Sequence, residues 1–266
     1  MTGVVPASGQ IEINTELSHR VYLQHEPVEA VTSMRSQIGQ PVVLNAPGEG
    51  KGPRFYFEVR DDDGVVLPMK PEATGQEAVM VAAQDLVVFT NDMIRLYAMG
   101  DPGQYTVQPC VEWIGKTYRG EKRHFEVVAG REVARITGVV PSDQTTRTYK
   151  MFHINRGHQD HILLRIDDEQ AGICYGVYPM GRSVLNEKPQ LAVDGQGHAH
   201  ILFQSAPRVF SHAVYSPRGQ VQVFENFGTD YSAVKLESQP NGSIRAVGQR
   251  ENRRPPPIID SVIENR

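Results

Sequence analysis

Two histidines, spaced to share one face of a strand, are the clearest candidates for chemistry in this sequence. His198 and His200 flank Ala199 in a run of β-forming residues, and residues two apart in a strand point to the same side. Imidazole pairs placed in this way ligate zinc, nickel or copper. Asp194 lies close by, across a predicted turn. A divalent metal is therefore the one cofactor we weigh, and a structural or surface role for the histidines is the alternative.

A second histidine pair lies at an equivalent place about 40 residues earlier. His158 and His161 enclose Asp160 at the start of another predicted strand. Residues of this kind often stand at the start of a strand because they form its turn. The same two interpretations, a metal ligand and a structural side chain, therefore apply to this pair.

Two runs of acidic residues are candidates for calcium sites. A calcium loop needs oxygen ligands at alternate positions and a more distant bidentate carboxylate. The run 61–64, Asp-Asp-Asp-Gly, lacks that spacing and predicts a hairpin with a type I′ turn. The run 167–169, Asp-Asp-Glu, is expected to lie in a solvated loop.

The sequence carries no motif of a covalent catalyst or a nucleotide-binding enzyme. It has no Gly-x-Ser-x-Gly, no phosphate-binding loop and no dinucleotide fingerprint. Cys110 and Cys174 have no nucleophile context, and two buried free thiols are the preferred interpretation. A glycosidase-like pair of carboxylates stays open, because such a pair meets only in the fold.

Composition excludes several classes of partner. The 266 residues are 39% hydrophobic and 22% charged, with a net charge of -4, which argues against a nucleic-acid partner. No apolar run approaches the roughly 20 residues of a membrane-spanning helix. The small residues of 1–9 fit a Met placed before a mature secreted chain, so we expect an extracytoplasmic (secreted or periplasmic) location.

Strand and turn signals dominate the chain, and we predict an all-β protein. Short runs of β-formers recur between turns such as Asp101-Pro102-Gly103. Helical signal is confined to 76–83 and 90–98, where Asn91 or Asp92 would cap at most two turns.

The predicted organisation has four parts. Residues 10–130 form a β-sandwich, 131–146 a linker, 147–250 a β-meander or blade-like domain, and 251–266 an extended tail. The linker prediction rests on the small residues and proline of 138–144.

The first domain resembles bacterial immunoglobulin-like and macroglobulin-like domains. The segments that carry the resemblance are 26–28, 55–59, 63–64, 101–107 and 125–127, with Pro-Gly-x-Tyr-x-Val at 102–107. The resemblance implies a sandwich that acts as a spacer or adhesive module. A protease-inhibitor-like module is the alternative that the macroglobulin likeness raises.

The second domain contains a faint repeat. The strands predicted at 161–166 and 200–205 are alike, and each is followed by a strand that contains tyrosine. The segment 191–203 resembles an inter-blade segment of sialidase-like β-propellers. About 110 residues are too few for a closed propeller. The domain is therefore a meander sandwich, an open stack capped by the first domain, or a unit that closes as a homo-oligomer.

Two further segments are predicted to bind partners. Phe224 and Phe227 lie near a predicted loop and are expected to be partly exposed. Pro255, Pro256 and Pro257 favour an extended tail segment, which either packs on its own domain or docks onto a partner.

The function expected from these observations is a non-enzymatic extracytoplasmic binding or assembly protein with a protein or glycan partner. A carbohydrate-active hydrolase or lyase, or an accessory domain of one, is the first alternative. A protease-inhibitor-like module is the second.

Overall fold

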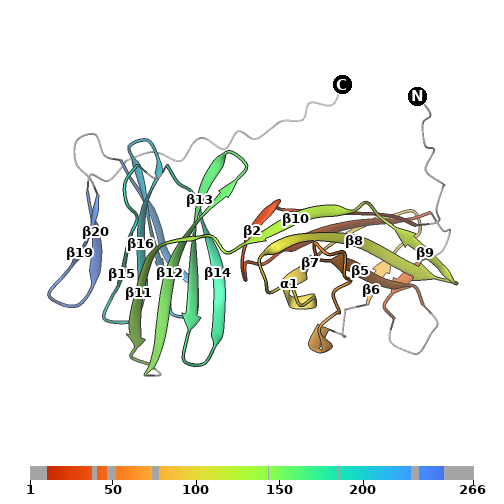
Figure 1. Ribbon diagram of the computed structural model, residues 1–266, viewed down its shortest axis with the longest axis horizontal. Helices are drawn as coiled ribbons and strands as arrows, with labels where there is room; N and C mark the ends of the chain where they lie inside the picture. The colour runs from red at the N-terminus through yellow and green to blue at the C-terminus, as the bar shows by residue number, and fades with distance from the viewer. Residues whose placement is uncertain are drawn as a thin grey trace. The chain divides into compact units, whose positions relative to one another are not determined.

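The structure is a computed structural model that describes residues 11–37, 41–46, 52–73, 78–142, 144–184, 186–228 and 234–248. The predicted all-β class is confirmed (Figure 1). The chain divides into two compact units. The first comprises Met1–Arg131, His153–Gln159 and Gly176–Tyr178, and the second comprises Glu132–Phe152, Asp160–Tyr175 and Pro179–Arg266.

The first unit contains two larger sheets and one small one. One larger sheet has the order β1-β3-β7, the other has the order β2-β10-β8-β5 with β9 paired to β8, and β4 pairs with β6. All pairs are antiparallel except β2 with β10. The strands are β1 (Ile11–Leu17), β2 (Val21–Leu23), β3 (Glu29–Ser36), β4 (Val42–Leu44), β5 (Arg54–Arg60), β6 (Val79–Val81), β7 (Leu86–Asp92), β8 (Gly103–Trp113), β9 (Lys116–Arg119) and β10 (Arg123–Val128).

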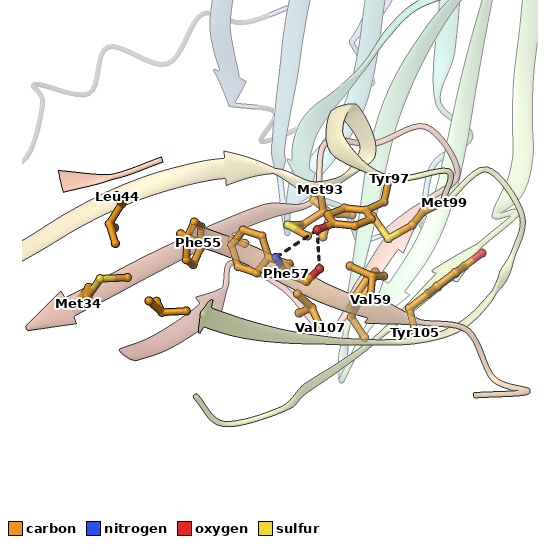
Figure 2. Packing of buried hydrophobic residues seen from close by; sticks show 14 of the residues in the cluster. Met34, Leu44, Phe55, Phe57, Val59, Met93, Tyr97, Met99, Tyr105 and Val107 are labelled. Carbon is orange, nitrogen blue, oxygen red and sulfur yellow. Dashed lines mark hydrogen bonds between the residues drawn. The ribbon is translucent and has the colours of Figure 1, made fainter. Parts of the chain in front are cut away.

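Alternating side chains from both larger sheets form the core of the first unit. On β5, Phe55, Phe57 and Val59 are buried while their neighbours are not. Figure 2 shows the Tyr97 hydroxyl beside the backbone of Phe57, where it donates to the carbonyl oxygen at 2.5 Å and accepts from the amide at 3.1 Å. Burial raises the pKa of Tyr97 to about 12, so the phenol keeps the proton that this pair of bonds requires.

The acidic hairpin forms with a different turn from the one expected. Asp61 accepts from the Gly64 amide at 3.1 Å, and Gly64 has a φ of 78°. The residues between them do not have positive φ, whereas a type I′ turn needs it at both central positions. The predicted type I′ turn is therefore wrong, because glycine supplies the left-handed conformation at one position only.

Helix is confined to short segments in the described part of the chain. The α-helix α1 (Met93–Leu96) is capped by Asp92, whose side chain accepts from the Ile94 amide, as the sequence predicted. A turn of 3₁₀-helix covers Pro71–Ala73. The helix predicted at 76–83 is wrong, because β6 lies there. None of the described helices has the length and apolar character needed to span a membrane.

The second unit is built mainly from two four-stranded antiparallel meanders and a hairpin, and the segments at 153–159 and 176–178 of the first meander are assigned to the first unit. The sheet orders are β11-β12-β13-β14, β15-β16-β17-β18 and β19-β20. The strands are β11 (Arg131–Val140), β12 (Thr145–Arg156), β13 (Gln159–Asp168), β14 (Ile173–Arg182), β15 (Gln190–Val193), β16 (Ala199–Ala206), β17 (Val209–Tyr215), β18 (Val221–Gly228), β19 (Lys235–Ser238) and β20 (Ile244–Val247).

These sheets stack on one another within the second unit (Figure 1). The first meander packs on one face of the second, where Tyr149 donates to the Gly197 carbonyl at 2.5 Å. The hairpin packs on the opposite face, which Leu202, Phe210 and Phe227 share with Val234 and side chains of β19 and β20. The two middle strands of the second meander, β16 and β17, are therefore covered on both faces.

The sequence repeat matched strands that are not equivalent. Residues 161–166 lie in β13, the third strand of its meander, whereas 200–205 lie in β16, the second strand of the next. Strands that are buried on both faces tend to have continuous apolar sequences. The segments 161–166 and 200–205 therefore resemble each other in sequence although they occupy different positions in their sheets.

The segment 131–146 is not a linker. It contains β11, which pairs with β12, and the turn that leads into β12. Gly138 lies so close to the second meander that a Cβ added there would be 2.6 Å from Val193 Cγ1. The proline and small polar residues of this segment therefore belong partly to a packed strand and partly to a hairpin turn.

We expect Gly138→Ala to destabilise the second unit by about 1–3 kcal/mol, because the new methyl group overfills a packed contact. The measurement is denaturant unfolding, with hydrogen exchange of peptides from β11 and β15. Adding Val193→Ala should restore much of the loss by making room. Equal stability of Gly138→Ala and the parent protein would show that this contact is not tight.

Candidate functional site

A row of ionisable side chains crosses the face of the second meander that the β19–β20 hairpin partly covers. Asp194 follows β15, His200 lies on β16, His212 on β17 and Glu225 on β18. Register pairs Ala192 with His200 and His212 with Glu225, which places the four side chains on one face. We call these four residues the histidine row.

Asp194 is fixed by its own turn. Its Oδ1 accepts from the amides of Gln196 and His198, both at 2.9 Å. Its Oδ2 lies 3.2 Å from His198 Nδ1 and 3.3 Å from His200 Nε2. The carboxylate therefore joins the turn to the first ring of the row.

The contacts continue across the remaining strands. His200 Nδ1 lies 3.2 Å from His212 Nε2, and His212 Nδ1 lies 3.2 Å from Glu225 Oε1. The two rings stack with their centroids 5.4 Å apart. His200 and His212 are both buried, so the row is a chain of polar contacts held largely out of water.

The number of N–H groups available to the three contacts of the histidine row depends on how many protons the two rings carry. Each neutral imidazole carries one N–H, so two neutral rings provide two protons for three contacts. A third proton fills every contact, with one N–H toward each carboxylate and one between the rings. A fourth proton would place two N–H groups against each other across 3.2 Å. The geometry therefore disfavours a state in which both rings are protonated.

The pKa shifts in the histidine row agree with the conclusion that its two rings are not protonated together. Burial lowers the pKa of His200 from 6.5, and the nearby His212 lowers it further, whereas the hydrogen bond to the Asp194 carboxylate raises it. Burial by itself would raise the pKa of Asp194, but the amides of His198 and Gln196 and the two imidazoles outweigh it and lower the pKa. Asp194 is thus an anion, and His200 takes up a proton less readily than a free histidine.

This charge state predicts a pH dependence of stability. Below pH 6.5 an unfolded chain protonates the imidazole of residue 200, whereas the lowered pKa of His200 keeps this ring neutral in the native row. The unfolded state then binds about one proton more, so stability falls by about 1.4 kcal/mol per pH unit as pH decreases toward the lowered pKa of His200. Unfolding measured between pH 8 and pH 4.5 should show this slope.

The control for that slope is the double variant His200→Leu, His212→Leu, which removes both rings. It should lose the part of the slope that belongs to the row. His124→Gln, at an exposed position of the first unit, should keep it. An unchanged slope in the double variant would contradict the lowered pKa of His200 as its cause.

The histidine row borders an open pocket of about 520 Å³. The walls include Val214, Val223 and Phe227 of the meander, with Ile244 and Val247 of β20. His200, His212 and Glu225 form its polar side, and Arg245 also lines it. We call this cavity the histidine pocket.

The pocket offers no imidazole nitrogen to a bound molecule. His200 uses one nitrogen toward Asp194 and the other toward His212, and His212 uses its nitrogens toward His200 and Glu225. A general base or nucleophile must reach the reacting atom of its substrate. These rings therefore fix the strands and the charge of the pocket, and its apolar walls are what a ligand meets.

The predicted metal ligands do not form a metal centre in the described part of the chain. No group of three or more His, Cys, Asp or Glu side chains there is placed to hold a metal ion. His198 and His200 instead share Asp194. His158 is exposed in the turn after β12, and His161 is half-buried on β13. The spacing identified a shared face correctly, but the neighbours on that face make hydrogen bonds.

The predicted partner-binding residues have three different outcomes. Phe224 is 53% exposed, as expected. Phe227 is 5% exposed, so its predicted exposure is wrong. It faces inward because it pairs with Phe210 and packs in the same cluster. Pro255, Pro256 and Pro257 lie outside the described residues.

The acidic run at 167–169 belongs to an ion-pair network and not to a solvated loop. Asp167 Oδ2 lies 2.8 Å from Lys150 Nζ, and Asp168 Oδ2 lies 3.0 Å from Arg147 Nη1. Glu169 also pairs with Lys150 at 2.8 Å. Amine and guanidinium groups therefore occupy the positions that a calcium ion would need.

A second pocket, in the first unit, is polar. It measures about 510 Å³ and is lined by residues of the β1–β2 and β9–β10 connections and their neighbours, among them Glu16, Arg20, Glu121 and Lys122. Both glutamates are exposed, and Glu121 pairs with Arg123 at 3.0 Å. Exposed carboxylates of this kind lack the apolar surroundings in which a catalytic acid usually lies.

Comparisons with known proteins yield one weak likeness. No family model matches the chain, and no curated protein matches it. Among solved structures, the chain is similar to Pseudomonas fluorescens alkylpurine DNA glycosylase AlkC bound to DNA containing an abasic site analog. The TM-score is 0.28 and the identity 17%, over 46% of this chain and 32% of that one. A similarity of this size supports no conclusion about fold or function.

Proposed function

We propose that this chain is a non-enzymatic, extracytoplasmic binding or assembly protein, and that the histidine pocket receives an apolar side chain of a partner protein. The observation that carries the proposal is a pocket with apolar walls beside two histidines whose ring nitrogens are all engaged within the chain.

The size and lining of the histidine pocket suit a side-chain anchor. Its volume of about 520 Å³ falls in the ordinary range of ligand sites. Val223 and Val247 are 41% and 44% exposed, so apolar surface remains to be covered. Burying one large apolar side chain there would contribute about 1.5–3 kcal/mol.

The position of β18 favours a partner in extended conformation. It is an end strand of its sheet in the described chain, and Val223 of this strand lines the pocket. An extended segment can add to such an edge through its backbone while one of its side chains enters a neighbouring pocket. A protein partner fits this combination.

The lining of the pocket favours a protein over a glycan. Sugars need aromatic faces and many polar partners, and Phe227 is the one Phe, Tyr or Trp among the described lining residues. A hydrolase of the glycosidase kind needs two facing carboxylates, and Glu225 is the one carboxylate in that lining. We propose in addition that the first unit is an immunoglobulin-like spacer, and no observation favours an inhibitor module.

The proposal is tested by selecting twelve-residue peptides from a display library on the immobilised protein and measuring the affinity of the synthesised peptides. We expect a common apolar anchor residue. Val223→Arg should weaken binding at least tenfold by placing a charge at the pocket. Gln222→Arg adds the same charge at the adjacent residue, which is exposed. This variant should bind the peptides with an affinity within about twofold of that of the parent protein.

Two results would overturn the proposal. One is the absence of any peptide whose binding distinguishes Val223→Arg from Gln222→Arg. The other is turnover of a panel of glycoside, ester or peptide substrates that Glu225→Gln abolishes while the variant stays folded.

A further inference from the structure

The strand β7 is an end strand with one neighbour. It closes the order β1-β3-β7 and pairs with β3 from Leu86 to Asp92. No other described strand pairs with it. The amide and carbonyl groups of alternate residues therefore point away from β3 and form an edge to which another strand can bind.

Natural end strands usually carry charged residues or proline, which discourage pairing with other chains. β7 has one charged residue, Asp92, at its last position. The Asp92 side chain is already used, because Oδ1 accepts from the Val28 and Ile94 amides. By contrast, β9 carries Lys116 and Arg119, and β18 carries Glu225.

The outward face beside this edge carries exposed apolar side chains, and the register places Arg35 opposite Leu86 and Ser33 opposite Val88. Leu86 and Val88 are 50% and 58% exposed. Val31 of the neighbouring strand β3 is exposed as well, and it pairs with Thr90. The open edge thus adjoins a small apolar patch made by Val31, Leu86 and Val88.

We infer that β7 pairs antiparallel with β7 of a second copy of this chain, about a twofold axis at Val88. This register places Val88 opposite its own copy, Leu86 opposite Thr90 and Val87 opposite Phe89. Each pair joins residues of the same face, so the apolar patches of the two copies become continuous. No two like charges lie opposite each other, so the strand is complementary to itself.

The register pairs five residues of β7 with five of its copy, and this short ladder with a small patch buries less than the area of a typical stable interface. We therefore expect a reversible dimer with a dissociation constant on the order of micromolar. This inference uses a surface on the first unit and does not depend on the histidine pocket. Either proposal can therefore fail without the other.

The experiment is sedimentation velocity of the full chain from about 1 to about 300 µM, a range that spans the expected dissociation constant. The monomer mass is 29.6 kDa, and we expect the mass to rise toward twice that value. Val88→Lys should hold the protein at the monomer mass, because two ammonium groups would face each other at the axis. Thr117→Lys, at an exposed position of β9, should dimerise like the parent protein.

Mixing two variants of opposite charge tests whether the twofold axis lies at Val88. Val88→Asp should also be monomeric, but an equimolar mixture of Val88→Asp and Val88→Lys should dimerise again, because opposite charges then meet. Circular dichroism checks that each variant is folded. A parent protein that stays at 29.6 kDa throughout, or a Val88→Lys variant that dimerises normally, would overturn the inference.

Discussion

Phe227→Ala is expected to lower the free energy of unfolding of the second unit by about 3–5 kcal/mol, because it removes a buried aromatic ring and leaves a cavity. Phe227 packs with Leu202, Phe210 and Val234 and lies beside the ring of His212. It also forms a wall of the histidine pocket. The same variant should therefore abolish binding of the selected peptides. Unfolding followed by hydrogen exchange in β16–β18 measures the first effect.

Phe224→Ala is the matched control, three residues away on the same strand. Because Phe224 is 53% exposed, its loss should change stability by less than about 1 kcal/mol. Equal effects of the two variants would contradict the assignment of Phe227 to the interior and of Phe224 to the surface.

Asp168→Ala is expected to cost about 3–5 kcal/mol, because it leaves the charge of Arg147 buried without its carboxylate. The side chains of Arg147 and Asp168 are 4% and 10% exposed. Asp168 Oδ1 also accepts from the Ala171 amide at 2.9 Å, so the substitution removes the bond that holds this turn. Denaturant unfolding with hydrogen exchange in β12 and β13 measures the loss.

Glu169→Ala is the comparison for the same network. The Glu169 side chain is 43% exposed and pairs with Lys150 and Arg135. Exposed ion pairs contribute little to stability because water screens them, so this variant should stay close to the parent protein. A loss as large as that of Asp168→Ala would show that the network acts as one unit and not through the buried pair.

Local chemistry made much of the fold predictable. The Asp101-Pro102-Gly103 turn leads into β8, and Asp92 caps α1. The all-β class followed from runs such as β5, whose alternate residues are buried. The segment 131–146 could not be assigned in this way, since the contact of Gly138 with Val193 comes from packing between sheets.

Half of the histidine row was visible in the sequence. His200 and the nearby Asp194 were singled out from their spacing, whereas His212 and Glu225 were not. Their place depends on register, and the β16–β17 pairing shifts at an irregularity between Gln204 and Ala206. Because one extra residue exchanges the two faces of a strand, spacing alone could not bring His212 beside His200.

The histidine pocket is tested most directly by methyl NMR of valine- and isoleucine-labelled protein, titrated with a peptide selected from the display library. The account predicts that the methyl signals of Val214, Val223, Ile244 and Val247, which line the pocket, shift in proportion to peptide bound. It also predicts that Val43 of the first unit, exposed on β4, does not shift. Shifts confined to first-unit methyl groups, with the pocket valines unchanged, would contradict the binding site.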